Sequence, residues 1–243
     1  MKDKSFILRL IGALLVVAML GAACSEAGND AGDATSGDQV ETNDDTMSSD
    51  TPDAEATTAA LDEGAAALTQ TLTDLLDSHV FLASIAVSTG LTAGLDSPEF
   101  EAAAATLDQN SQDLAGAIES VYGAEAGDQF LKLWRQHIGF FVDYTAGKAT
   151  KDDAKADKAL KALENYKKDF SEFLDTATGG ELPADAASDA LQMHVDSLID
   201  AIDAAIAGDP KVFDKIYEAA TGHMPMTASA LAGAITAQFP DKF

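Results

Sequence analysis

The chain has 243 residues and is strongly acidic, with 41 Asp and Glu against 15 Lys and Arg and a formal net charge of −26. A surface this negative repels phosphate backbones, so the composition argues against nucleic acid as a partner. The single cysteine excludes an internal disulfide and a zinc site built from several cysteines.

Residues 1–23 have the pattern of an export signal. Lys2, Lys4 and Arg9 form a basic start, and an apolar run over 10–20 follows that is too short to span a bilayer. Small residues come next. We therefore predict a signal peptide over 1–23, which places the mature protein outside the cytoplasm.

The only cysteine, Cys24, directly follows this segment in the sequence Leu-Gly-Ala-Ala-Cys. This sequence resembles the lipobox of bacterial lipoproteins, although Gly21 stands where that family prefers an aliphatic residue. The resemblance covers the first tenth of the chain. It implies that Cys24 is lipidated, becomes the mature N-terminus and anchors the protein to the cell membrane. An ordinary signal peptide that contains a cysteine is the alternative.

The next segment, 24–57, is acidic and polar. Residues 25–58 include ten Asp and Glu and no Lys or Arg, and most of the others are Ser, Thr, Gly, Ala and Asn. Such a composition buries too little apolar surface to offset the entropy of ordering the chain. We predict a disordered tether over 24–57, extended by repulsion between its like charges.

From residue 58 onward, apolar residues recur three and four positions apart, which is the helical period. Turn and cap signals divide this part into six predicted helices, near 58–92, 98–121, 126–146, 151–177, 184–207 and 210–238. No segment alternates with the period of a strand. Because the connections are short, neighbouring helices should be antiparallel, so we predict an all-α helical bundle over 58–243.

Several of these boundaries have a local explanation. Ser97 before Pro98 and Asp209 before Pro210 are typical of helix starts, and Thr150 with Asp153 resembles a capping box. Three glycines stand where helix C-terminal caps are expected, namely Gly123, Gly147 and Gly208.

The bundle part contains a short repeat. The pentapeptide Leu-Ala-Gly-Ala-Ile occurs at 114–118 and again at 231–235. His79, His137 and His194 follow each other at intervals of 58 and 57 residues, about half the distance between the two pentapeptides. We interpret these spacings as three helical hairpins of similar length.

Every histidine falls on the apolar stripe of its predicted helix, close to the middle of that helix. The four are His79, His137, His194 and His223. Mid-helix positions share a level in an antiparallel bundle, so the four imidazoles could converge. Buried imidazoles need partners for their ring nitrogens, and a metal ion, a haem, or a hydrogen-bonded network that includes Asn110 would supply them.

Methionines lie close to two of these histidines. Met193 precedes His194, and Met224 and Met226 follow His223, with Pro225 between them. Imidazole together with thioether suits copper, particularly Cu(I). We therefore predict a copper site at the four histidines with Met224 or Met226 as further ligands and Asn110 beside them. Pro225, near Gly222, predicts a break or kink in the last helix.

These observations favour a membrane-anchored lipoprotein that binds, buffers or delivers a transition metal. The alternatives are a structural or interaction lipoprotein of the cell envelope with hydrogen-bonded core histidines, and a bundle that binds haem without a covalent link. The sequence has no Glu-x-x-His, His-Glu-x-x-His, Cys-x-x-Cys-His, Gly-x-Ser-x-Gly or phosphate-binding glycine loop. We therefore do not predict an enzyme.

Overall fold

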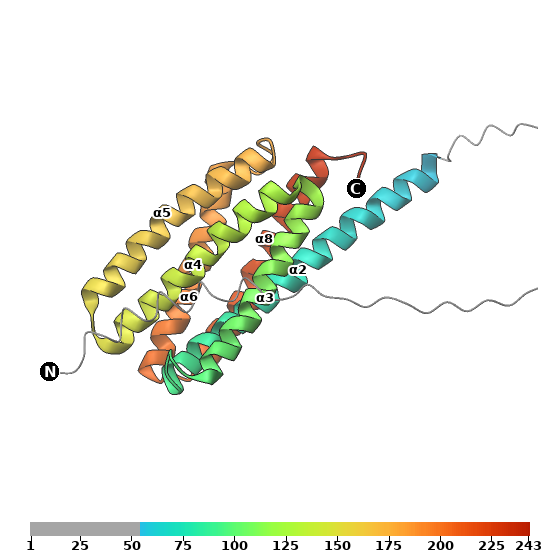
Figure 1. Cartoon of the computed structure of the whole chain (residues 1–243). Helices are drawn as coiled ribbons and strands as arrows, with labels where there is room; N and C mark the ends of the chain where they lie inside the picture. The colour runs from blue at the N-terminus through green and yellow to red at the C-terminus, as the bar shows by residue number, and fades with distance from the viewer. Residues whose placement is uncertain (1–53) are drawn as a thin grey trace, which may run out of the picture. The chain divides into compact units, whose positions relative to one another are not determined.

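The computed structural model describes the backbone of residues 54–243 and the side chains of residues 63–243 (Figure 1). This part is helical and contains no strand. Its elements are α2 (Ala54–Thr92), α3 (Pro98–Tyr122), α4 (Ala124–Thr150), α5 (Asp153–Ala177), α6 (Ala184–Ala207), α7 (Val212–Glu218), the π-helical turn η1 (Ala219–His223) and α8 (Met224–Gln238). The predicted signal peptide, Cys24 and most of the predicted tether lie outside the described residues.

The predicted all-α bundle is confirmed. Five long helices match the first five predictions, and α7, η1 and α8 together occupy the place of the sixth. Helix α2 begins at Ala54, so residues 54–57, which we assigned to the tether, belong to the first helix. By length and composition alone, its segment Glu63–Thr92 is apolar enough to cross a membrane; in this fold the helix packs against α3 and α8.

Successive helices pack side by side and run antiparallel, as α4 and α5 show in Figure 1. The third of the predicted hairpins differs from the other two. Helices α2 and α3 form one pair and α4 and α5 another, whereas α6 pairs with α7 and η1. The last helix, α8, lies against α2 and so joins the end of the described chain to its beginning.

The core is formed by the apolar stripes of these helices. Among its most buried side chains are Leu72, Val80, Leu163 and Ile235. The two copies of the repeated pentapeptide bury the same positions, namely Leu114, Ala115 and Ile118 in α3 and Leu231, Ala232 and Ile235 in α8. The repeat therefore marks two helices that pack with the same face.

Some helix ends follow the prediction. The Ser97 hydroxyl accepts a hydrogen bond from the Phe100 N–H at 3.1 Å, which caps α3. Gly123 and Gly208 end α3 and α6 with positive φ values of 89° and 68°. Asp209 accepts from the Lys211 N–H at 3.0 Å, but α7 begins only at Val212, because the residues around Pro210 form a turn.

The predicted boundary between α4 and α5 is wrong in two respects. Helix α4 continues through Gly147 to Thr150, and the cap of α5 is Asp152, whose side chain accepts from the Lys155 N–H at 3.0 Å. Thr150 is the last residue of α4 and forms no capping box. Gly147 serves packing instead, since a Cβ there would lie 2.7 Å from the backbone nitrogen of Ala156 in α5.

We expect Gly147→Ala to destabilise the bundle by about 1–3 kcal/mol, because the new methyl group would push α4 and α5 apart. Gly139→Ala is the matched control. Gly139 lies in the same helix, and a Cβ added there would have nothing within 4 Å, so its replacement should stabilise the fold by about 0.5–1 kcal/mol. Urea unfolding followed by circular dichroism measures both, and equal effects would contradict the packing role of Gly147.

The irregularity predicted near Gly222 and Pro225 is present as the π-helical turn η1, which ends at His223. Pro225 is at the start of α8, where its missing N–H costs no helical hydrogen bond. Such turns insert an extra residue into a helix and are frequent at functional sites. The turn changes the direction in which His223 points relative to a regular helix.

Candidate metal centre

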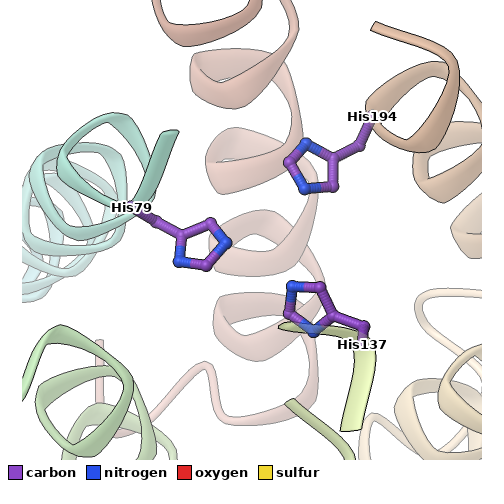
Figure 2. Close-up of side chains that lie close together, drawn as sticks. All are labelled: His79, His137 and His194. Atoms are coloured by element: carbon purple, nitrogen blue, oxygen red, sulfur yellow. The ribbon is translucent and has the colours of Figure 1, made fainter. Parts of the chain in front are cut away.

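Three of the four histidines converge in the middle of the bundle. His79 comes from α2, His137 from α4 and His194 from α6, and Figure 2 shows the three rings turned toward a common point. Their ring centroids lie 5.5 to 6.3 Å apart. One nitrogen from each ring lies within 4.8 Å of the chosen nitrogens of the other two.

This spacing is close to that of a metal site. Three atoms no more than 4.8 Å apart have a point that is at most about 2.8 Å from each, whereas zinc–imidazole bonds measure about 2.0–2.1 Å. Each ring would therefore move by less than about 1 Å to reach a metal at the centre. Rotamer adjustments of this size are small for side chains held on rigid helices. The three histidines could hold a metal ion.

The cluster is dry. His79, His137 and His194 are 1%, 2% and 5% exposed. Within the described part of the chain, four of their ring nitrogens are buried without a hydrogen bond of normal geometry: His79 Nδ1, His194 Nε2 and both nitrogens of His137. An unpaired buried polar group costs about 1–3 kcal/mol. These nitrogens therefore lower the stability of the fold unless a ligand binds them.

Burial keeps these imidazoles neutral. It lowers the pKa of His79 to about 4 and brings the pKa values of His137 and His194 well below 6.5. Repulsion from neighbouring rings lowers these two pKa values further: His79 and His194 act on His137, and His79 and His223 act on His194. A neutral imidazole has a free lone pair, which is the form that binds metals.

Asn110, the predicted neighbour of the histidines, lies in α3 and is 5% exposed. Its Nδ2 donates to the carbonyl of Leu75 at 2.9 Å, which fixes the amide against α2. Its Oδ1 has no hydrogen bond of normal geometry, but the side chain is close enough to His79 to raise the pKa of that ring against the larger effect of burial. Asn110 therefore contacts the cluster from its edge.

His223 does not join the three rings, as we had expected it could, but contacts one of them. Its Nε2 lies 3.2 Å from His194 Nδ1, and the two ring centroids are 5.4 Å apart. With the shared proton on His194 Nδ1, the opposite nitrogen of His194 keeps its lone pair for a ligand. Partners of this kind orient metal-binding histidines in many sites.

The predicted methionine ligands are separated by the structure. Met224 is 3% exposed and packs in the hydrophobic core, whereas Met226 is 59% exposed on α8. Met193, beside His194, is also half exposed. Met226 therefore points away from the buried core where the three rings meet.

Aromatic side chains enclose the three rings. Trp134 contacts both His79 and His137, with centroid distances of 4.8 and 4.5 Å, and Tyr166 stacks on His137 at 5.0 Å. Trp134 Nε1 and the Tyr166 hydroxyl are buried without partners. No sequence signal singled out Tyr166, because α5 carries no histidine.

Searches of protein-family models, curated proteins and solved structures give no match to this chain. The described part of the chain has one group of histidines that could hold a metal ion, in which three helices bring together His79, His137 and His194.

Proposed function

We propose that this protein is a membrane-anchored lipoprotein that binds one copper ion, as Cu(I), through His79, His137 and His194. Its role would be to bind, buffer or deliver the metal outside the cytoplasm. The observation that carries the proposal is the convergence of three neutral imidazoles with unpartnered nitrogens in a dry core.

The main competing function is a structural lipoprotein whose histidines only stabilise the core. That role requires hydrogen bonds for the buried rings. His194 and His223 supply one such bond, but neither nitrogen of His137 has one of normal geometry, although the Trp134 backbone lies near the ring. One metal ion would bind one nitrogen of each of the three rings, which favours the binding function.

Charge favours a monovalent ion. No Asp or Glu in the described part of the chain joins the three histidines as a candidate ligand, so the ligand set is neutral. The cost of transferring an ion into an apolar medium rises with the square of its charge, which makes an uncompensated divalent ion much more costly than Cu(I). Imidazole is also a suitable ligand for copper.

A haem is disfavoured by packing. A porphyrin needs a flat cavity beside the ligand rings, and Trp134 and Tyr166 fill the space against His137. Phe141 adds a third aromatic contact on the same ring, at 6.1 Å between centroids. Haem binding would require these side chains to leave the core together.

Export and anchoring rest on the sequence of the first 24 residues. A lipid on Cys24 and an acidic segment after it would hold the bundle near a membrane but apart from it. Residues 59–243 carry a net charge of about −18 by count, which attracts cations and raises their local concentration.

The test is metal binding by the full chain, isolated in detergent and stripped with a chelator. After addition of Cu(I) under anaerobic reducing conditions and removal of free metal, elemental analysis should give one copper per chain. Free Cu(I) at about 1,000 times Kd should stabilise the fold by about 4 kcal/mol. For a domain of this size, the midpoint of thermal unfolding should rise by about 8–16 °C.

Two variants serve as controls for this test. His137→Leu removes a ligand and should abolish both the bound copper and the rise in midpoint. His223→Gln leaves the three ligands in place and should bind copper with an affinity reduced about 10- to 100-fold. Absence of copper from the unaltered chain would refute the proposal, and one equivalent of Zn²⁺ retained more tightly than Cu(I) would refute its choice of metal.

A further inference from the structure

The buried centre needs a route for the metal, and exposure differs among the histidines. His223 is 9% exposed, more than any of the three converging rings, and it hydrogen-bonds directly to His194. It lies at the end of the π-helical turn η1, beside the exposed residues Thr221 and Gly222. His223 is therefore the point at which the cluster comes closest to solvent.

Two exposed methionines flank this point. Met226 follows His223 by three residues, which places it about one helical turn away along α8, and its side chain is exposed. We infer from helical spacing that Met193 lies on the side of α6 that faces α7 and η1. Asp200, seven residues further along α6 and thus on the same side, pairs with Lys215 of α7 at 2.7 Å.

The antiparallel pairing of α6 with α7 and η1 sets the level of Met193. Asp200 pairs with Lys215, and His194 with His223, so the register of the two segments puts Met193 at about the level of the His223 end of η1. Met193 is 50% exposed and Met226 59% exposed. Large apolar side chains at this exposure gain little from packing, and thioethers are soft ligands for Cu(I).

Electrostatics attract a cation to the same place. Glu218, five residues before His223, raises the pKa of His223 against the larger effect of burial, because its negative charge favours a cation on the ring. The net negative charge of the chain also attracts cations.

We propose that Cu(I) enters the centre past His223, with the exposed thioethers of Met193 and Met226 as its first ligands. This route deepens the proposed function and rests on it. Copper held at the surface by the two thioethers passes to His223 Nε2, whose hydrogen bond to His194 breaks. It then passes to the three buried rings, and the hydrogen bond forms again behind it. Only ligand exchange is involved, with no change in oxidation state.

The test measures rates separately from affinity. The full chain receives Cu(I) from a coloured Cu(I) chelator in a stopped-flow instrument, and the absorbance of the chelator reports loading and release. The double variant Met193→Leu with Met226→Leu should load Cu(I) about tenfold more slowly, as expected when about 1.4 kcal/mol of stabilisation is lost from the loading step. Release should slow by the same factor and Kd should stay unchanged, because the buried ligands are intact.

Two controls distinguish this route from entry of the metal elsewhere in the bundle. Zn²⁺ has little preference for thioethers, so the double methionine variant should load Zn²⁺ at the unaltered rate. His223→Gln should slow the loading of both metals. The route is overturned if the methionine variant loads Cu(I) as fast as the unaltered chain, or if His223→Gln changes only release. Failure to bind any metal at equilibrium would instead refute the proposed function.

Discussion

Replacing His137 with leucine is expected to stabilise the metal-free protein by about 1–3 kcal/mol while it abolishes metal binding. Both ring nitrogens of His137 are buried without a hydrogen bond of normal geometry, since the Trp134 backbone lies near the ring but is not well placed to bond it, and the side chain is 2% exposed. Leucine has a similar volume and no polar atom, so it removes an unsatisfied group without leaving a large cavity. A metal site that is strained when empty should behave in this way.

His223→Leu is the matched comparison and should have the opposite sign. It removes the partner of His194 Nδ1 and leaves that nitrogen buried, which should cost about 1–3 kcal/mol. Urea unfolding in the presence of a strong chelator measures both variants. If His137→Leu destabilises the metal-free chain as much as His223→Leu does, the histidines serve the core and the metal proposal loses its main support.

The apolar periodicity was sufficient to place three of the four histidines correctly. His79, His137 and His194 lie in regular helices, where steps of three and four residues keep one face toward the core. The similar intervals between them along the chain brought them to one level. For these three histidines, the direction of the side chain and its position along the bundle could therefore be predicted from the spacing of residues alone.

His223 could not be placed in the same way, because its helix is not regular. Helical spacing correctly predicts that His223 is buried, but the π-helical turn that ends at His223 adds a residue to the helical repeat, so spacing alone does not show that the ring contacts His194 rather than the common point of the other three. Gly222 and Pro225 signalled the break, but neither shows how far the ring turns. Met226 was predicted as a ligand from its closeness to His223 in the sequence, and it lies exposed on α8.

The boundary between α4 and α5 was misplaced for a different physical reason. Glycine is compatible both with a helix end and with a close helix contact, and the sequence around Gly147 does not separate these uses. The contact with Ala156 exists only once α5 has folded back on α4. Tyr166 was missed on similar grounds, since its stacking on His137 depends on the packing of two helices.

Acid should unfold the metal-free protein more steeply than its acidic composition suggests. The pKa of His79 is about 4 in the folded chain, and those of His137 and His194 lie well below the usual 6.5. Between pH 6.5 and 4 the unfolded chain therefore binds protons that the folded chain does not, and the free energy of unfolding falls as the pH falls. Well above pH 6.5 the three rings are neutral in both states and contribute no pH dependence.

The size of this effect is large for a single domain. Each histidine contributes up to about 1.4 kcal/mol per pH unit, so three together give a slope of up to about 4 kcal/mol per pH unit near pH 5. The polar groups near the three rings reduce this slope only a little. Asn110 favours the charged form of His79 only weakly compared with burial, and Glu218 acts on His223 rather than on the three rings.

Urea unfolding at a series of pH values measures the slope, and histidine proton NMR gives the individual pKa values. His137→Leu should reduce the slope near pH 5 by about one third, because one of the three buried rings is absent. A slope unchanged by this variant would assign the acid sensitivity to carboxyl groups.

Bound copper should shift this acid transition to lower pH, since a metal holds the rings in their deprotonated form. Protons and metal compete for the same lone pairs, so copper affinity should fall as the pH drops through the range in which free histidine titrates. The metal is then released where the bundle itself becomes unstable. A protein that delivers copper on acidification would need this coupling, and copper retention at pH 4 by a chain that remains folded would show that the three imidazoles are not its ligands.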